Sequence, residues 1–323
     1  MGNEQAVVFE RNKMVHRRIA RILACAGWEV RSVEQPESLD AAAIAALVEP
    51  ERPTLLVADG FDLDLVCRAI QNRPRAQVLL YSGEPDERNG GRLLQRALEE
   101  PRIVGILGRA SFEAPPREAD LLAVAAQARA GVPIPFEAQA AWGASTFAYA
   151  ITDAAERDGA VREVINFTAR LGAPKRVGEM LGELAHELIM NALYDAPVDG
   201  AGRPLYAHDR KAEIRVQRED AAVIRCASDG VRLAIEVTDR FGRLERQHVF
   251  GGLVRALKSG QMDQAGGGAG LGMMVAYRST TALFYDVVRG QRTRVTGLFE
   301  LDLNLREFKQ LPKTIHFPVV MAG

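Results

Sequence analysis

Residues 177–195, VGEMLGELAHELIMNALYD, decide how the second half of the chain is interpreted. Apolar side chains recur there at steps of three and four residues, which is the spacing of a helix that buries one face. They are Val177, Leu181, Leu184 and Leu188. Glu187 and Asn191 are four residues apart, so a helix brings their carboxylate and carboxamide onto one face. These groups are either an ordinary surface pair or polar groups at the edge of a core, where a ligand satisfies them.

Two later stretches follow in the chain and add to the meaning of this helix. Residues 234–244, AIEVTDRFGRL, are an apolar, strand-like run that ends at Asp239, three residues before Gly242. Residues 266–277, GGGAGLGMMVAY, are a glycine-rich run that leads into a helix. Glycines at a helix start let backbone N–H groups approach phosphate oxygens, and the helix dipole favours an anion there. The phosphate-contacting candidates are Gly268, Gly270 and Gly272.

In order and spacing, these three stretches resemble the N, G1 and G2 boxes of the GHKL ATPase superfamily, which includes gyrase-type ATPases, Hsp90, histidine kinases and MutL. Residues 157–177 contain a further helical segment directly before the Glu187 helix. This arrangement is most similar to the anti-sigma-factor serine kinases of the superfamily. The resemblance covers residues 145–315 and implies a GHKL (Bergerat) α/β sandwich that binds ATP and Mg²⁺.

The resemblance also implies roles for individual residues. Asn191 would hold the Mg²⁺ that bridges the phosphates, Glu187 would act as general base, and Asp239 would accept a hydrogen bond from the adenine amino group. The chemistry agrees, because a carbonyl oxygen is a hard ligand for Mg²⁺ and a partly buried carboxylate gains basicity from desolvation. The further nucleotide contacts implied by the resemblance are Gly242, Gly268, Gly270, Leu271, Gly272 and Thr293.

Thr293 lies on the return strand of a hairpin that we predict in residues 283–303. By the same resemblance, residues 244–267 would be the ATP lid. Arg255 and Lys258 within this lid either contact phosphate or are solvated surface charges.

The chain departs from the GHKL pattern at two places. The family pattern is Asp-x-Gly-x-Gly, whereas here Phe241 occupies the position of the first glycine and the next residue is Gly242. Phe241 either closes part of the adenine pocket or packs under it. Tyr194 and Asp195 stand where the related kinases carry a basic residue that touches phosphate. An acid at this place repels the phosphates unless Mg²⁺ lies between them. These departures leave open whether the nucleotide is turned over.

The first part of the chain has a different pattern, in which short apolar runs alternate with helical segments. This alternation predicts a parallel sheet covered by helices on both faces. The expected strands are residues 6–9, 28–33, 54–59, 77–82 and 103–107, and residues 116–130 are the expected last helix. Ligand chemistry in such sheets gathers at the carboxyl ends of the strands. The polar residues expected at those ends are Glu10, Asp59, Ser82 and Arg109.

In these features residues 5–131 resemble the receiver domain of response regulators, with Asp59 as the phosphoacceptor and Ser82 as the hydroxyl residue. Glu10 is followed by Arg11 where the family has a second acid, and Arg109 replaces the family's lysine. A cation in place of an acid weakens a Mg²⁺ site, and Arg11 could fill the metal's place by pairing with Asp59. The domain is therefore either a degenerate receiver or one that retains phosphorylation of Asp59.

We accordingly predict an α/β protein in which a flavodoxin-like, receiver-type parallel sheet in residues 1–131 precedes a linker in residues 132–145 and a GHKL domain in residues 146–323. Its 41 Lys and Arg residues balance 42 Asp and Glu residues, which argues against nucleic-acid and membrane partners. The chain has no run of 18 apolar residues, and its start does not resemble a signal peptide, so we expect a cytoplasmic protein. We also expect its three cysteines, Cys25, Cys67 and Cys226, to be buried thiols.

Two classes of function remain open from the sequence. The first is a Ser/Thr protein kinase or ATPase of the anti-sigma-factor type, regulated by the receiver-like domain and acting on a sigma-factor or anti-anti-sigma type of partner. The second is an inactive signalling scaffold, in which nucleotide is only a conformational ligand or is absent. A homodimer is compatible with both. A complete histidine kinase is not expected, because residues 131–160 are too short for the dimerising hairpin that carries its histidine.

Overall fold

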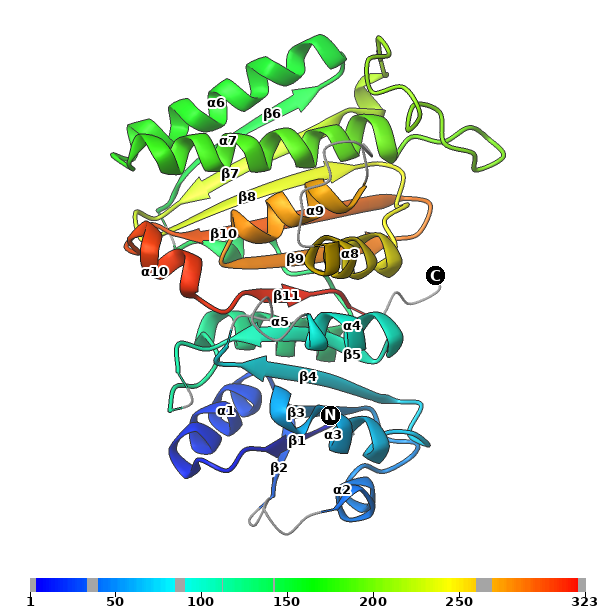
Figure 1. The fold of residues 1–323 in the computed structure, drawn as a ribbon, viewed down its shortest axis with the longest axis vertical. Helices are drawn as coiled ribbons and strands as arrows, with labels where there is room; N and C mark the ends of the chain where they lie inside the picture. Colours follow the sequence, from blue (N-terminus) through cyan, green and yellow to red (C-terminus); the bar gives the residue numbers. More distant parts are fainter. Residues whose placement is uncertain are drawn as a thin grey trace. The chain divides into compact units, whose positions relative to one another are not determined.

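The computed structural model describes residues 4–33, 40–84, 91–111, 113–141, 143–259 and 269–318. The chain forms two compact units (Figure 1). Unit 1 comprises residues 1–134 and 310–319, and unit 2 comprises residues 135–309 and 320–323. The second domain was expected to comprise residues 146–323, whereas the structure groups residues 310–319 with the first unit.

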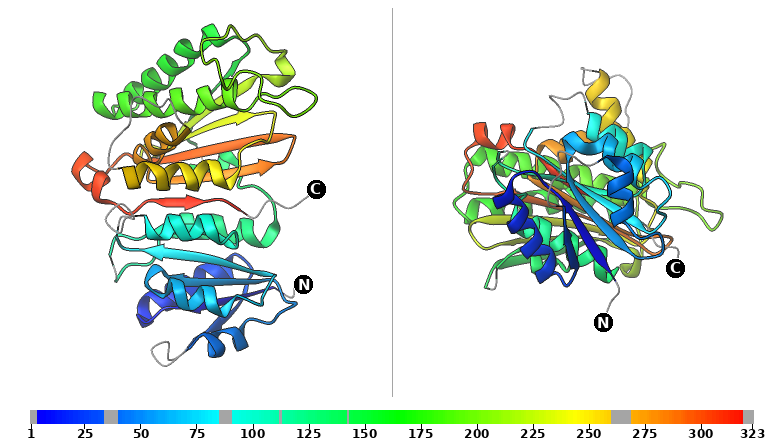
Figure 2. Two further views of the ribbon diagram at one scale, coloured as in Figure 1. Left: turned by 45° about the vertical axis from the view of Figure 1, so that its right-hand side comes forward. Right: turned by 90° about the horizontal axis from the view of Figure 1, so that it is seen from below.

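Unit 1 is built on a parallel sheet, drawn in blue and cyan in Figures 1 and 2. Its strands run in the order β2-β1-β3-β4-β5, which is a doubly wound arrangement. The strands are β1 (Gln5–Phe9), β2 (Glu29–Ser32), β3 (Thr54–Asp59), β4 (Ala76–Ser82) and β5 (Ile103–Gly108). β1, β3 and β5 are buried along their whole length, as expected for strands covered on both faces. The predicted strands are therefore confirmed.

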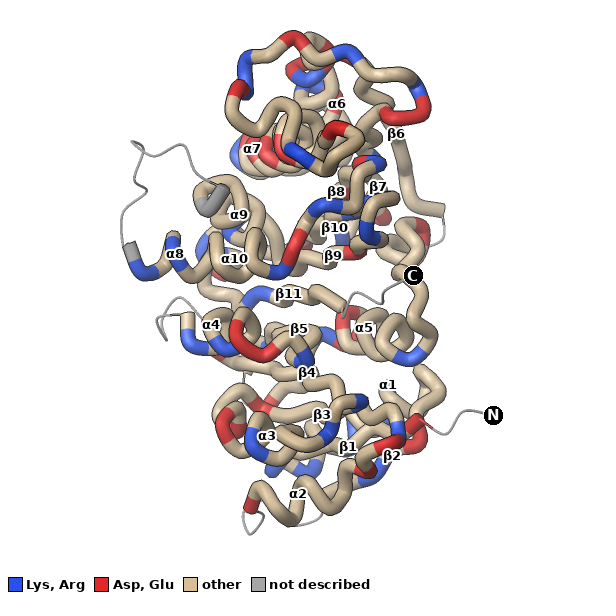
Figure 3. The backbone as a smooth tube through the Cα atoms, turned by 90° about the vertical axis from the view of Figure 1, so that its right-hand side faces the viewer, with Lys and Arg blue, Asp and Glu red and all other residues tan. Residues whose placement is uncertain are grey.

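Helices cover this sheet on both sides, with α1 and α5 on one side and α3 and α4 on the other (Figure 3). They are α1 (Lys13–Cys25), α2 (Ala41–Leu47), α3 (Leu63–Ala69), α4 (Arg92–Glu99) and α5 (Glu118–Ala130), with a short 3₁₀ helix η2 (Gly60–Asp62) after β3. Asn12 and Asp40 cap α1 and α2 by accepting hydrogen bonds from first-turn N–H groups. The helix predicted in residues 116–130 is confirmed.

A strand from the end of the chain completes unit 1, and the sequence analysis did not anticipate it. This strand, β11 (Thr314–His316), pairs antiparallel with β5. The Thr314 hydroxyl donates to the buried carboxylate of Asp120 at 2.9 Å and accepts from Arg117 at 2.8 Å. His316 is fully buried, with Nδ1 2.8 Å from the carbonyl oxygen of Val104. Only three residues long, this strand is too short to show a periodic pattern.

Gly108 offers a test of this closing contact. We predict that Gly108→Ala lowers the free energy of unfolding by about 2 kcal/mol, because a Cβ at residue 108 would collide with the carbonyl group of Pro312. Gly159→Ala is the matched control, since nothing lies within 4 Å of a Cβ at that helical position, and it should cost nothing or stabilise by up to about 1 kcal/mol. Urea denaturation of both variants measures the difference, and equal unfolding midpoints would contradict the close approach.

Unit 2 is built on an antiparallel sheet in the order β9-β10-β8-β7-β6. The strands are β6 (Ser145–Ile151), β7 (Ala222–Ser228), β8 (Arg232–Asp239), β9 (Ala282–Val288) and β10 (Arg292–Glu300). β8 and the β9–β10 hairpin agree with the sequence predictions. β6 and β7 were not predicted.

Helices α6, α7, α8 and α9 lie over one face of this sheet (Figures 1 and 2). The helices of unit 2 are α6 (Arg157–Arg170), α7 (Lys175–Met190), α8 (Gly252–Ser259), α9 (Ala269–Arg278) and α10 (Leu305–Gln310), with 3₁₀ turns η3 (Phe136–Gln139), η4 (Ala154–Glu156) and η6 (Arg218–Asp220). The apolar stripe predicted on α7 is buried, from Val177 to Leu188. Gly182 allows α6 and α7 to approach closely, since a Cβ there would lie 2.9 Å from Cδ1 of Ile165.

The thiols differ from the expectation, since Cys226 is buried, Cys67 is intermediate and Cys25 is exposed. The prediction of buried thiols was wrong for Cys25, because this last residue of α1 lies off the stripe that Ile19 and Leu23 bury. Lys and Arg are interspersed with Asp and Glu along both units (Figure 3). No helix in the described part of the chain is long and apolar enough to cross a bilayer.

Candidate functional site

Unit 2 contains a pocket of about 360 Å³ between the end of α7, the carboxyl end of β8 and the start of β10. Its volume lies in the range of small-molecule sites, about 300–1,000 Å³. Three residues from separate predicted stretches line it, namely Asn191, Asp239 and Thr293. The other lining residues are Leu188, Ala192, Asp195, Ala196, Pro204, Ala207, Arg210, Val237, Arg243, Leu244, His248, Met273 and Val295.

Two π-helical turns flank the pocket. After α7 the chain continues in the turn η5 (Asn191–Asp195), which is closed by a 2.9 Å hydrogen bond from the Ala196 N–H to the Asn191 carbonyl. The second turn, η7 (Gln247–Gly251), carries His248 to the pocket. Such π-helical turns are rare in proteins overall, and those that occur are frequently found at functional sites. No signal in the sequence distinguished them from ordinary helix.

Asp239 ends β8 and is 7% exposed. Its Oδ1 accepts hydrogen bonds from the N–H groups of Phe241 at 2.8 Å and Gly242 at 3.2 Å. Burial raises the pKa of this carboxyl group, while the two N–H donors and the neighbouring Thr293 act against the rise. Thr293 lies opposite Asp239 in the β8–β10 register, and no described group meets its buried hydroxyl in good hydrogen-bond geometry. A ligand that carries both donor and acceptor groups would complete this pair.

Gly242 supports the turn after Asp239 but does not line the pocket. Its φ of 61° lies in the left-handed region, and a Cβ there would collide with the carbonyl of Val288 in the β9–β10 hairpin. The contact anchors the turn that holds Asp239. Phe241 is half-buried and is not among the lining residues.

Glu187 lies one helical turn before Asn191, is half-buried, and is not among the lining residues. A Cβ at Gly272 would collide with its carboxylate, so the absence of a side chain at Gly272 lets α9 pass close to Glu187. Leu271 is 38% exposed and also does not line the pocket. Gly270 lies in the first turn of α9. The predicted phosphate contact Gly268 and the preceding Gly266 and Gly267 lie outside the described residues.

The described residues contain no group of three or more His, Cys, Asp or Glu side chains that could hold a metal ion by themselves. Asn191 offers one amide oxygen to the pocket, next to Asp195. Mg²⁺ commonly keeps several waters and binds through one or two protein groups together with substrate phosphates. The side chains present therefore fit a Mg²⁺ ion that arrives with a nucleotide.

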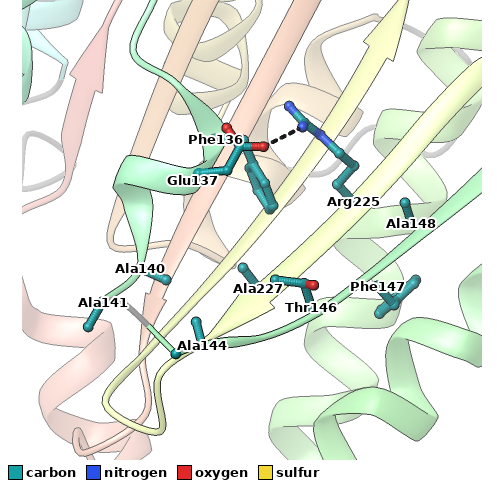
Figure 4. Close-up of a pocket in the computed structure, with 11 residues that line it drawn as sticks. Phe136, Glu137, Ala140, Ala141, Ala144, Thr146, Phe147, Ala148, Arg225 and Ala227 are labelled. Carbon is teal, nitrogen blue, oxygen red and sulfur yellow. Dashed lines mark hydrogen bonds and ion pairs between the residues drawn. The ribbon is translucent and has the colours of Figure 1, made fainter.

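A second hollow, of about 380 Å³, lies against β6, β7 and the segment that precedes β6 (Figure 4). Five of its eleven lining residues are alanine. The charged pair at its side is already satisfied, because Arg225 donates to Glu137 at 3.0 Å and to the buried Glu236 at 2.5 Å. No residue predicted from the sequence lies here, and its lining offers no further reactive group.

The polar residues at the carboxyl ends of the unit 1 strands form a second cluster. Arg109, which is 1% exposed, donates hydrogen bonds to Asp59 and to Glu10, the latter at 3.3 Å. The Tyr81 hydroxyl donates to the same Glu10 oxygen at 2.7 Å. Burial raises the pKa of Asp59, and the Phe61 N–H and the Arg109 guanidinium act against the rise. Burial next to Glu10 also raises the pKa of Tyr81.

The interpretation that Arg11 fills a metal's place by pairing with Asp59 is corrected by these contacts. Arg11 forms a bidentate ion pair with Asp62, at 2.5 and 2.6 Å. The cation on Asp59 is Arg109, because its place directly after β5 brings it inside the cluster, whereas Arg11 is 44% exposed at the rim. Ser82 donates to the Glu84 carbonyl at 2.9 Å and so closes its own turn.

We predict that Arg109→Ala destabilises the chain by about 3–5 kcal/mol near pH 7, because two buried carboxylates lose their counter-charge. Because burial raises the pKa of Asp59 in the folded chain, the Asp59 carboxyl group stabilises the fold most when it is protonated. This stabilisation is fully present below the ordinary pKa of an aspartate and is lost as the pH rises through the raised pKa. Removal of Arg109 raises this pKa further, so the loss should shrink near pH 4.

Urea denaturation at both pH values measures this effect. Arg92→Ala is the control, because it removes an arginine from an exposed ion pair with Asp64 in the same unit and should cost about 1 kcal/mol or less. An Arg109→Ala loss that is the same at both pH values would contradict the account.

Comparison with known proteins yields distant structural similarity. No protein-family model and no curated protein matches the chain. Among solved structures, a chain of the SiaB–SiaC complex from Pseudomonas aeruginosa is similar at 14% identity and a TM-score of 0.35. The similarity covers 48% of this chain and 88% of that one. A similarity of this size carries no argument about the activity of this protein.

Proposed function

We propose that unit 2 binds ATP with Mg²⁺ in the pocket beside α7, and that the chain is a cytoplasmic signalling protein of the bacterial type. The observation that carries the proposal is the convergence of Asn191, Asp239 and Thr293 on one pocket. Their spacing along the chain resembles that of the GHKL superfamily, so the proposal includes the GHKL architecture for unit 2. The buried hydroxyl of Thr293, which no described group meets in good hydrogen-bond geometry, lies next to a buried carboxylate and supports a ligand at this place.

Each of the three residues has a task in this proposal. Asp239 accepts a hydrogen bond from the adenine amino group, which discriminates against guanine because guanine has a carbonyl there. Thr293 provides a second polar group, its hydroxyl, next to the Asp239 carboxylate. Asn191 supplies an oxygen to the Mg²⁺ that the phosphates bring.

Within this proposal, phosphoryl transfer to a protein hydroxyl or to water is assigned to Glu187 as general base. The close approach of α9 to Glu187 supports this role, since the glycine-rich run opens α9. A second candidate function is favoured by the position of Glu187 outside the lining residues. In that case the protein is a partner-binding module, and nucleotide acts only as a conformational ligand.

Unit 1 is, in this proposal, a degenerate receiver that regulates unit 2. The buried guanidinium of Arg109 already holds Asp59 and Glu10, the groups that would otherwise bind Mg²⁺ and accept phosphate. Its pairing supports a unit that does not run an aspartyl-phosphate cycle. The proposed partner is a protein of the sigma-factor or anti-anti-sigma type.

We predict that Asp239→Asn weakens ADP binding at least about tenfold, because the adenine amino group loses a charged acceptor. Stability should be unchanged or slightly higher near pH 7, since an amide costs less to bury than a carboxylate whose pKa burial has raised. Calorimetry with Mg²⁺ and ADP measures the first effect. Asp229→Asn is the matched control, because Asp229 also accepts backbone N–H groups at a turn next to β8 but does not line the pocket. An Asp239→Asn variant that binds ADP with wild-type affinity would contradict the role of Asp239 in adenine recognition.

Single-turnover hydrolysis separates the enzyme from the binding module. If Glu187 is the general base, Glu187→Gln slows ATP hydrolysis about 100-fold or more while ADP affinity stays within about twofold of wild type. Glu183→Gln, an exposed change one turn earlier on α7, serves as the control. Equal rates in wild type and Glu187→Gln would instead support the binding module.

A further inference from the structure

The chain between η5 and β7 folds back onto the pocket of unit 2. This connection, residues 196–221, is much longer than the roughly 4–6 residues of a common connection. Pro204, Ala207 and Arg210 from it line the pocket. Two hydrogen bonds from other parts of unit 2 hold it there, from the Tyr194 hydroxyl in η5 to the Ala212 carbonyl at 3.2 Å and from Arg243 in the turn after β8 to the Gly202 carbonyl. Long ordered loops of this kind are usually functional.

Arg210 brings a positive charge into the pocket at the point where Asp195 carries a negative one. Its Nη2 donates to Asp195 at 2.6 Å, and both side chains are about one-third exposed, at 39% and 32%. Burial raises the pKa of Asp195, while Arg210 and, less strongly, His248 act against the rise. The ion pair therefore opposes the effect of burial on this carboxyl group.

The donors of Arg210 are only partly used. Among the described residues, its only side-chain hydrogen bond is the one to Asp195. A guanidinium group has five N–H donors in a rigid fork that matches the oxygens of a phosphate group. An arginine oriented by one carboxylate, with its other donors remaining, is suited to bind an anion that enters the same pocket.

We propose that Arg210, positioned by Asp195, is a specificity-determining residue of this pocket that binds the phosphate groups of an adenine nucleotide. This inference rests on the proposed nucleotide function and deepens it. The carboxylate of Asp195 alone would repel phosphate. Arg210 offsets that charge and supplies guanidinium N–H donors from a different segment. The pocket therefore selects nucleoside diphosphates and triphosphates over the bare nucleoside.

Calorimetry with adenosine and with ADP, on the full chain, tests the proposal. Arg210→Ala should weaken ADP binding about tenfold and adenosine binding less than about twofold, because only ADP has the phosphates. Arg210→Lys should recover part of the loss, since it keeps the charge without the fork. Arg203→Ala is the matched control. Arg203 belongs to the same connection and pairs with Asp199 at 2.8 Å, but it does not line the pocket.

The role of Asp195 is tested in the Arg210→Ala background. Without Arg210, the carboxylate of Asp195 repels phosphate, so adding Asp195→Asn should restore ADP affinity by about threefold or more. A residue that only supports the fold would not show this recovery. Thermal denaturation checks that each variant folds, and if Arg210→Ala does not, Arg210→Gln against Arg210→Lys makes the same comparison.

The outcomes separate this inference from the proposed function. Wild type that binds neither adenosine nor ADP overturns both. Wild type that binds both ligands, with Arg210→Ala weakening them equally or not at all, overturns the role of Arg210 and leaves the nucleotide site in place. A selective loss of ADP binding supports the role.

Discussion

The register of β10 against β8 sets Thr293 opposite Asp239, and the pocket of unit 2 depends on this pairing. A carboxylate that is 7% exposed needs donors, and the chain provides two backbone N–H groups from the turn after β8. Gly242 lets that turn press against the β9–β10 hairpin, so the position of the carboxylate is fixed from two sides. A shift of one residue in this register would move Thr293 to the other face of the sheet and leave the pocket without its polar floor.

Charge balance decides what each unit can bind. In unit 1, Arg109 lies inside the acidic cluster and uses its guanidinium on Asp59 and Glu10, so the cluster is closed by the protein itself. In unit 2, Arg210 meets a single carboxylate at the border of a pocket and keeps donors for a ligand. The same type of ion pair is thus a structural element where it is fully buried and a candidate recognition element where solvent and a cavity adjoin it.

Local departures from regular structure supply much of the pocket. The π turns η5 and η7 contribute Asn191, Asp195 and His248, and the connection after η5 contributes Arg210. Regular elements hold these pieces, since α7 is buried along its apolar stripe and β8 lies inside the sheet. Rigid elements with irregular ends are a common way to bring polar groups to a cavity without exposing the core.

The sequence by itself determined the periodic elements, because an apolar repeat of three to four residues or an unbroken apolar run reflects burial directly. It thereby predicted the five parallel strands of unit 1, helix α7 and the β9–β10 hairpin. The resemblance to the GHKL superfamily, rather than periodicity, named Asn191, Asp239 and Thr293, which line one pocket. Only the tertiary structure decided that β11 returns to unit 1, that Arg109 rather than Arg11 meets Asp59, and that Arg210 meets Asp195. Most of these contacts join residues that are far apart in the chain. Arg210 and Asp195 are closer in the chain, but they meet only because the connection between them folds back onto the pocket. No local sequence pattern encodes either kind of contact.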